Sequence, residues 1–161
     1  MSTMIMHIDN CCNASDEIPA ASSAIACDLV DSYHHAIYRI DTGPGSIALR
    51  IGQFSRSLPD LLNELKCTRA AIISAYNPYS QQLGHDENET AHRSLRKLLI
   101  HRSYPIIEGI NLDPSGHWPV EKSFFVAGLD LDTAKSIGQK YSQNAILWIA
   151  EDAVPRLVLL R

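Results

Sequence analysis

The chain has 161 residues, 45% of them hydrophobic and 20% charged, and its net charge is −4. This length and composition are typical of one globular domain with a sizeable core. The acidic balance argues against a dedicated binder of duplex DNA, and no apolar run approaches the roughly 18 residues that a membrane span needs.

The N-terminal segment lacks a clear hydrophobic period, so we expect a flexible arm over residues 1–20 and a single domain over residues 21–161. The first lysine or arginine is Arg39, which argues against a secretory signal or transit peptide and favours a cytoplasmic protein. The four cysteines, of which Cys11 and Cys12 are adjacent, lack the C-x-x-C spacing of a zinc or redox site, and we expect reduced thiols.

The first half of the domain is predicted to begin with a helix and a hairpin. Apolar residues recur between residues 20 and 32 as on one face of a short helix. The segments "HHAIYRID" and "IALRIG" are typical of strands, and the turn "TGPGS" between them predicts a hairpin. The segment "SLPDLLNELK" predicts a helix capped by Ser57, and the apolar run over residues 70–75 predicts a central strand covered on both faces.

The second half is predicted to alternate helices with strands. Residues 86–101 are predicted to form a helix, with acids first and bases last, as the helix dipole prefers. The turn "DPSG" between "YPIIEGINL" and "PVEKSFFVAG" predicts a second hairpin. A last helix follows in "LDLDTAKSIGQKYS", capped by Asp130 or Asp132, and then strands in "NAILWI" and "RLVLL". This order predicts an α+β fold, with a mixed β-sheet, two hairpins and three to four packed helices.

The loop after the central strand is the first candidate site, with Tyr76, Asn77 and Ser80. Ligands often bind beyond the carboxyl ends of strands, and polar loops on apolar scaffolds tend to carry function. The acidic start of the following helix would repel a phosphate, so a neutral polar ligand or a cation suits the loop better. The alternative is a turn followed by a helix cap.

The helix after that loop carries Asn88 and His92, which are four residues apart and share one face. His92 lies at the edge of the buried stripe, where a half-buried imidazole suits a general acid or base. The alternative is a boundary histidine that only makes a structural hydrogen bond.

The second hairpin carries two glutamates, Glu108 and Glu121. If the loop is only "DPSG", these residues face each other across the strands. Facing carboxylates repel unless water screens them or a proton, an arginine or a divalent metal lies between them, and a shared proton would suit acid–base chemistry. A bulge at Trp118-Pro119 would shift the register and move Glu121 to the other face, and solvated acids at a sheet edge are the alternative.

Two further stretches could contact a ligand or a partner. Gln143 and Asn144 lie between the last helix and an apolar strand, so their amides could bind a ligand, although a left-handed Asn144 at the helix end would also explain it. A basic stretch over residues 92–102 includes Arg93, Arg96 and Lys97 and suits RNA or an acidic protein partner, although the helix dipole explains most of it.

Three motifs, "AYNPYSQ", "GHWPVEKSFFVAGLD" and "GQKYSQNAILWI", together resemble a family of short bacterial proteins catalogued as domain-of-unknown-function family 3293. The resemblance covers roughly residues 29–149 and implies one compact bacterial domain. It transfers no activity and no catalytic residue. The positions that match the family pattern are Asn77, Pro78, Ser80, Glu121, Ser123, Gly128, Gln143, Asn144 and Trp148.

Two functional hypotheses follow from these residues. The first is an enzyme acting on a nucleotide or nucleic-acid-like substrate, with Glu108, Glu121 or His92 as acid and base. The second is a non-catalytic binding or regulatory module that uses the same pocket or the basic helix 92–102. A third arrangement has Glu108 and Glu121 holding a divalent metal with His92. The residues expected to bind the ligand are Tyr76, Asn77, Ser80, Asn88, Gln143 and Asn144.

Overall fold

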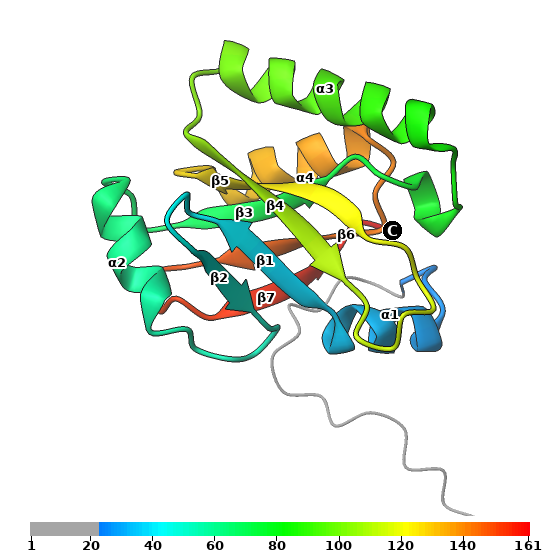
Figure 1. The fold of residues 1–161 in the computed structure, drawn as a ribbon, viewed down its shortest axis with the longest axis horizontal. Coiled ribbons are helices and arrows are strands. Elements are labelled where there is room, and N and C mark those ends of the chain that lie inside the picture. Colours follow the sequence, from blue (N-terminus) through cyan, green and yellow to red (C-terminus); the bar gives the residue numbers. More distant parts are fainter. Residues whose placement is uncertain (1–22) are drawn as a thin grey trace, which may run out of the picture.

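A curled antiparallel sheet with helices on both faces forms the frame of the molecule (Figure 1). The computed structural model describes residues 23–161. The helices are α1 (Cys27–His35), α2 (Ser57–Glu64), α3 (His85–His101) and α4 (Leu131–Lys140), with a 3₁₀ turn η1 (Pro78–Ser80). The strands are β1 (Ile37–Asp41), β2 (Ser46–Leu49), β3 (Ala70–Ser74), β4 (Ile106–Leu112), β5 (Glu121–Ala127), β6 (Ala145–Ile149) and β7 (Pro155–Leu159).

The strand order is β2-β1-β4-β5-β3-β6-β7, and every pair of neighbouring strands in the described part of the chain is antiparallel. The predicted α+β class is confirmed, but the sheet is antiparallel where a mixed sheet was expected. Helical connections usually join parallel neighbours. Here α2, α3 and α4 each link strands that run in the same direction but lie apart, because at least one antiparallel strand is inserted between them.

The two faces of the sheet have separate cores, and Figure 1 shows α3 and α4 together along one side. We call the side packed against α1 and α2 the α2 face, and the side packed against α3 and α4 the α3 face. Leu58, Leu61 and Leu62 of α2 belong to the first core, and Leu95 and Leu99 of α3 belong to the second. Every residue of β3 is buried, so the prediction of a central strand covered on both faces is confirmed.

Most predicted elements are present, with differences at their ends. The first helix begins at Cys27 and runs to His35, later than the predicted span of residues 20–32. The arm predicted over residues 1–20, with Cys11 and Cys12, lies outside the described residues. No helix in the described range is long and apolar enough to cross a membrane.

The predicted caps have mixed outcomes. Ser57 is the first residue of α2 and makes no side-chain cap, so that prediction is wrong. The reason is that α2 begins through a backbone bond, in which the Leu58 N–H donates to the Ser55 carbonyl at 3.1 Å. Of the two aspartates considered for α4, Asp130 is the cap, and its Oδ1 accepts from the Thr133 N–H at 2.9 Å.

The register of the second hairpin differs from the one that a "DPSG" loop would give. The loop spans residues 113–120, because the Asp113 carboxylate accepts the N–H groups of both Ser115 and Trp118 at 2.9 Å and so closes a wider turn. As a result Glu108 pairs with Phe124, and Asn111 is the residue that pairs with Glu121. The predicted Glu108–Glu121 pair is therefore wrong.

Gly109 of β4 pairs with Ile40 of β1 on one side and with Ser123 of β5 on the other. A Cβ at this position would lie 2.7 Å from the Arg39 carbonyl oxygen and 3.3 Å from the Ser123 hydroxyl. The first contact is with backbone, which can move only if β1 separates from β4. A glycine at this position therefore lets β1, β4 and β5 lie side by side with the spacing that sheet hydrogen bonds need.

We expect Gly109→Ala to lower the free energy of unfolding by about 2 kcal/mol, because the added methyl group overpacks the centre of the sheet. Denaturant unfolding followed by circular dichroism measures the change. Gly45→Ala is the matched control, since a Cβ there has no atom within 4 Å and its effect should stay within about 0.5 kcal/mol. Equal effects of the two substitutions would contradict the proposed crowding.

Candidate functional site

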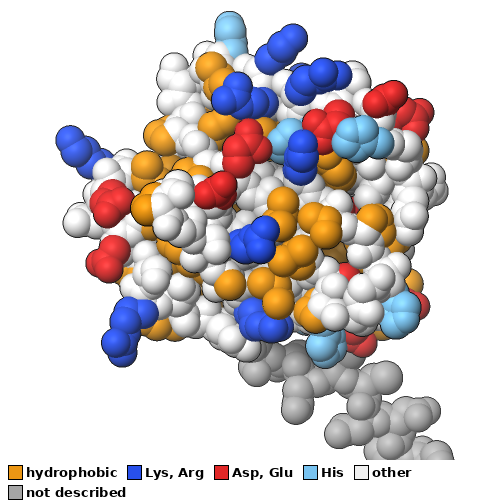
Figure 2. All heavy atoms as spheres, viewed as in Figure 1, with side chains coloured by type: hydrophobic (Ala, Val, Ile, Leu, Met, Phe, Trp, Pro, Cys, Tyr) orange, Lys and Arg blue, Asp and Glu red, His pale blue; other side chains and the backbone are white. Residues whose placement is uncertain are grey.

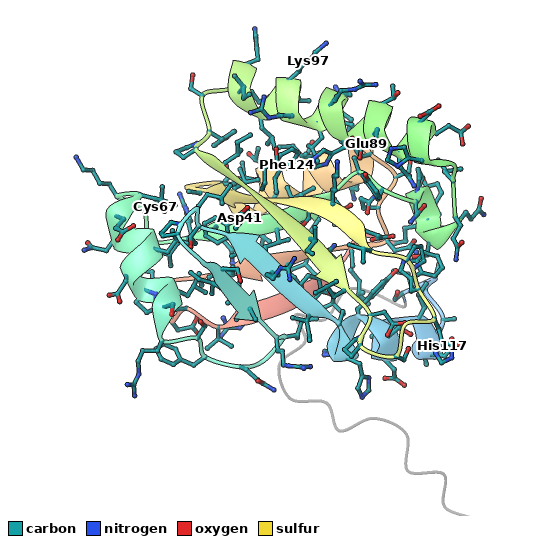
Figure 3. All side chains as sticks on the ribbon, viewed as in Figure 1. Asp41, Cys67, Glu89, Lys97, His117 and Phe124 are labelled. Carbon is teal, nitrogen blue, oxygen red and sulfur yellow. The ribbon has the colours of Figure 1, made fainter. Side chains whose placement is uncertain are left out.

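A pocket of about 770 Å³ lies between α1, the loop 113–120 and the α2 face of the sheet. Its volume falls in the range of small-molecule sites. Figure 3 shows His117 of that loop beside α1, at the edge of the pocket. Ile72, Leu147 and Leu157 form part of an apolar wall. Its polar lining includes Tyr33, Ser74, Asn77, Ser80, Asn111, Glu121, Gln143 and Asn144.

Strand register places one row of polar residues on this wall. Tyr38 of β1 pairs with Asn111 of β4, which in turn pairs with Glu121 of β5. Residues that are direct partners across antiparallel strands point to the same face. The row is therefore fixed by the sheet itself, and its side chains all face the pocket.

The Glu121 carboxylate is half satisfied within the protein. Its Oε1 accepts from Asn77 Nδ2 at 2.7 Å and from Trp118 Nε1 at 2.9 Å. Its Oε2 accepts no hydrogen bond from any described residue. Burial raises the pKa of Glu121, and the bonds from Asn77 and Trp118 oppose that rise. The site thus presents one held carboxylate oxygen and one that a ligand can reach.

Asn111, next to Glu121 in the row, has a buried Oδ1 with no hydrogen-bond partner among the described residues. A buried carbonyl oxygen without a donor is costly and uncommon in folded proteins. The other neighbour in the row cannot supply a donor, because the Tyr38 hydroxyl donates to the Tyr33 carbonyl at 3.1 Å. Because this oxygen is buried within the pocket wall, a ligand in the pocket does not contact it in this conformation.

The loop that follows β3 is organised by Asn77, which is 4% exposed and left-handed, with φ of 47°. Its N–H donates to Asn88 Oδ1 at 2.9 Å, and its Oδ1 accepts from Asn88 Nδ2 at 2.9 Å and from the Leu83 N–H at 3.0 Å. Its Nδ2 donates to Glu121. Asn77 therefore joins the loop, α3 and β5, and Asn88 is a structural partner of this loop behind the pocket.

Gln143 and Asn144 both line the pocket, and the side-chain amide of each donates hydrogen bonds to protein oxygens. Asn144 Nδ2 donates to the Tyr33 hydroxyl at 3.2 Å and to the Ser80 hydroxyl at 3.0 Å, and those two hydroxyls lie 2.8 Å apart. Gln143 Nε2 donates to the Tyr76 carbonyl at 3.1 Å. The left-handed residue at the end of α4 is Ser142, with φ of 54°, so the explanation of Asn144 as a left-handed cap is wrong.

Three hydrogen bonds attach Tyr33 of α1 to the rest of the pocket. Its hydroxyl bonds to Ser80 and accepts from Asn144 Nδ2, and its carbonyl accepts from the Tyr38 hydroxyl. No residue of α1 is fully buried, although Val30 and Tyr33 pack partly against the core of the α2 face. The helix is therefore a wall of the pocket held by a few polar bonds and a small apolar contact.

The remaining predicted residues lie on the opposite side of the sheet. His92 is 5% exposed, stacks on Phe124 with ring centres 4.2 Å apart, and has Nε2 3.3 Å from Glu108 Oε2. Figure 3 shows Phe124 between the sheet and α3. Burial lowers the pKa of His92, which favours the neutral imidazole. Arg96 Nε lies 3.5 Å from the same carboxylate and partly offsets its charge.

A second polar group on the α3 face is centred on Glu89. Its carboxylate accepts the Tyr76 hydroxyl and lies 2.6 Å from Lys122 Nζ. The bond from Lys122 and then that from Tyr76 lower the pKa of Glu89 to about 2. Burial and the bond to Glu89 raise the pKa of Tyr76. The Tyr76 side chain therefore points away from the pocket, and only its backbone carbonyl contributes to the loop.

The predicted catalytic set is thus divided between the two faces. Residues alternate in direction along a strand, and Glu108 and Asn111 are three apart, so Glu108 faces α3 while Glu121 faces the pocket. The two carboxylates cannot share a proton or hold one metal ion. No cluster of three or more metal-ligating side chains occurs in the range 23–161. His92 is also buried, so it is wrong to count it in the exposed basic surface of residues 92–102.

Several residues of the site carried no signal strong enough to select them from the sequence. Asn111 lies in a strand and Trp118 in the loop that follows it, and both are residue types common at such positions. Tyr33 lies on a short helix, where a tyrosine is equally ordinary. Only the true hairpin register shows that Asn111 and Tyr38 belong to the same row as Glu121. The Asp113 side chain that sets this register was a usable signal, because aspartate at the start of a turn often binds the following N–H groups.

Residues 73–146 match the model of a family described as Protein of unknown function (DUF3293). The match confirms, over this segment, the resemblance inferred from the three motifs. It includes Asn77, Asn111, Glu121 and Asn144, while α1 and β1 lie outside it. No curated protein and no solved structure matches the chain.

We expect Asn77→Gly to lower the free energy of unfolding by about 2–3 kcal/mol. Glycine keeps the left-handed backbone available, so the loss comes from the side-chain bonds to Asn88, Leu83 and Glu121. Urea unfolding measures the change. Asn63→Gly is the control, because Asn63 is exposed on α2 and should lose less than about 1 kcal/mol. Similar losses at the two positions would show that the Asn77 network is not what stabilises the loop.

We expect Glu121→Gln to raise the melting temperature by about 3 °C, or roughly 1 kcal/mol, with a gain that grows with pH. Because burial raises the pKa of Glu121 above its ordinary 4.5, the native state holds this proton more tightly than the unfolded chain. The wild type therefore loses stability as pH rises from about 4.5 through the raised pKa, whereas glutamine stays neutral.

Thermal unfolding of both proteins between pH 4 and 8 measures this difference. Glutamine still offers an oxygen to Asn77 and Trp118, so the variant should fold. The exposed Glu64→Gln is the control and should change the midpoint little at any pH. A difference between Glu121→Gln and the wild type that stays constant, or that shrinks as pH rises, would contradict the expectation.

Proposed function

We propose that the protein binds a nucleotide-like small molecule, whose base enters the pocket on the α2 face. The observation that carries the proposal is the Glu121 carboxylate, whose Oε2 accepts no hydrogen bond from a described residue, beside the Asn111 amide in the wall of a 770 Å³ pocket. A planar polar ring suits a space that combines apolar side chains with a few convergent hydrogen-bonding groups.

The charges around the pocket favour an uncharged sugar over a phosphate. Asp28, Asp31 and Asp113 are among the lining residues, and Arg50 is the one lining lysine or arginine of the described residues. Anionic groups at a pocket repel a phosphate. A nucleoside, or a base displayed by a longer chain, therefore fits better than a free nucleotide.

A second candidate function is an enzyme in which Glu121 acts as the acid–base group. The raised pKa of Glu121 and its accessible Oε2 favour this role, because a carboxyl with a raised pKa can hold and return a proton nearer neutral pH. Glu108 and His92 take no part, since they face α3. In such an enzyme Glu121→Gln removes turnover, so product analysis of a bound nucleoside separates the two functions.

The alternative to ligand binding in the pocket is binding of a macromolecule by the basic surface of α3. Arg93, Arg96 and Lys97 are exposed on this helix, and Figure 2 shows lysine and arginine side chains gathered over it. Arg96 is already paired with Glu108. This surface suits short RNA or an acidic protein and is independent of the pocket.

We also propose that the protein acts in the bacterial cytoplasm. The bacterial origin is what the resemblance of the three motifs to short bacterial proteins implies, and the cytoplasm is supported by the free thiols Cys27 and Cys67.

A thermal-shift screen of nucleobases, nucleosides, nucleoside monophosphates and short RNA tests the proposed function. A ligand at a hundred times its dissociation constant stabilises the native state by about 2.7 kcal/mol, which raises the midpoint by several degrees. We expect a shift with nucleosides that Glu121→Gln abolishes and that Glu108→Gln, on the opposite face, leaves intact. A shift with RNA alone that Arg93→Ala and Lys97→Ala remove would instead support the α3 surface and contradict the pocket.

A further inference from the structure

Glu121 and Asn111 each have one side-chain atom that makes no hydrogen bond within the described residues. These atoms are Oε2 of Glu121 and Nδ2 of Asn111. Over residues 23–161, the buried side-chain nitrogen and oxygen atoms that lack a partner are His92 Nδ1 and Asn111 Oδ1. Glu121 Oε2 and Asn111 Nδ2 are not among them, so both atoms are accessible from the pocket that their residues line.

The two accessible atoms have opposite hydrogen-bonding character and belong to neighbouring residues. Asn111 and Glu121 are direct partners in the β4–β5 register, and such partners have Cβ atoms about 5 Å apart. An amide nitrogen only donates, whereas an ionised carboxylate only accepts. No hydrogen bond joins the two side chains to each other, so one ligand can engage both.

The hydroxyls of Tyr33 and Ser80 supply a further donor to the pocket. Both accept from Asn144 Nδ2, and they lie 2.8 Å apart, so one hydroxyl donates to the other. The second hydroxyl hydrogen then has no acceptor among the described residues. A ligand that carried only donors would leave this hydrogen and Asn111 Nδ2 unmatched.

On the basis of the proposed function, we infer that Glu121 and Asn111 together bind the amide-type edge of a neutral heterocycle, in which a ring N–H lies next to a carbonyl. The ligand N–H donates to Glu121 Oε2, and the ligand carbonyl accepts from Asn111 Nδ2. Hypoxanthine and uracil both carry such an edge. Methylation of the ring nitrogen removes the N–H and keeps the carbonyl.

Two substitutions separate the two bonds. In Glu121→Gln the bonds from Asn77 and Trp118 hold the amide oxygen, so an NH₂ group takes the place of Oε2 and cannot accept from the ligand N–H. Asn111→Ala removes the bond to the ligand carbonyl and leaves Glu121 in place. Glu108→Gln makes the same chemical change as Glu121→Gln on the α3 face and is the matched control.

Isothermal titration of the full chain with two matched pairs, inosine with 1-methylinosine and uridine with 3-methyluridine, tests the inference. For a pair that binds, we expect methylation to weaken binding by roughly tenfold or more in the wild type and in Glu108→Gln, because a hydrogen bond to a charged group has an effect of this size. In Glu121→Gln this preference for the unmethylated compound should disappear. In Asn111→Ala both compounds should lose affinity by a similar factor, since both keep the carbonyl.

The outcomes separate this inference from the proposed function, and a cooperative thermal transition checks that each variant is folded. A methylation effect of equal size in the wild type and in Glu121→Gln would reveal steric exclusion of the methyl group. That result, or equal affinity of the wild type for both members of a pair, would overturn the edge recognition while supporting nucleoside binding. No binding of any of the four compounds would also overturn it, and the thermal-shift screen then decides separately whether another nucleoside binds.

Discussion

The side chain of Asn77 is the interaction on which the arrangement of the pocket depends. Asn77 follows the end of β3, and its three side-chain hydrogen bonds, with a fourth from its backbone N–H, reach α3, the following loop and β5. The left-handed backbone of Asn77 turns the chain so that these bonds can form together. Because one of them holds Oε1 of Glu121, the orientation of the carboxylate in the pocket is set by a residue 44 positions away in sequence.

The alternation of side chains along β5 gives the two faces of the sheet different chemistry. Glu121 and Ser123 face α2, whereas Lys122 and Phe124 face α3. On the α3 face the charges of Glu89 and Lys122, and of Glu108 and Arg96, are paired, while the buried Nδ1 of His92 has no hydrogen-bond partner among the described residues. On the α2 face the carboxylate and the neighbouring amide meet too few donors. The pocket is therefore identified by its volume together with the unpaired Oε2 of Glu121 in its wall.

Local patterns in the sequence were enough for the helices, the strands and the α+β class. The run Ala70–Ser74 is buried on both faces as its composition indicated, and both hairpins form. The predicted pairing of Glu108 with Glu121 is wrong because strand register depends on the length of the turn. The Asp113 side chain lengthens this turn by accepting the N–H groups of Ser115 and Trp118. The prediction of a mixed sheet failed because the placement of β5 beside β3 depends on contacts between distant segments, which the hydrophobic period of each segment does not reveal.

The candidate site shows the same division between local and distant information. Asn77, Ser80, Glu121, Gln143 and Asn144 were selected as polar residues at the ends of apolar elements, and the fold brings them to one pocket. Their partners Asn111, Trp118 and Tyr33 come from a strand, a loop and a helix whose polar residues resemble ordinary surface positions. Only the three-dimensional register separates them from such positions.

The attachment of α1 has a consequence for how the pocket exchanges its contents with water. The helix is held by the bonds of Tyr33 to Ser80, Asn144 and Tyr38 and by partly buried side chains, and water can replace each of those bonds when the helix lifts away. Segments with so little buried surface open at a small fraction of the global unfolding energy. The pocket can therefore open by local separation of α1 from the sheet. A molecule that contacts both α1 and the sheet would stabilise the docked position of the helix.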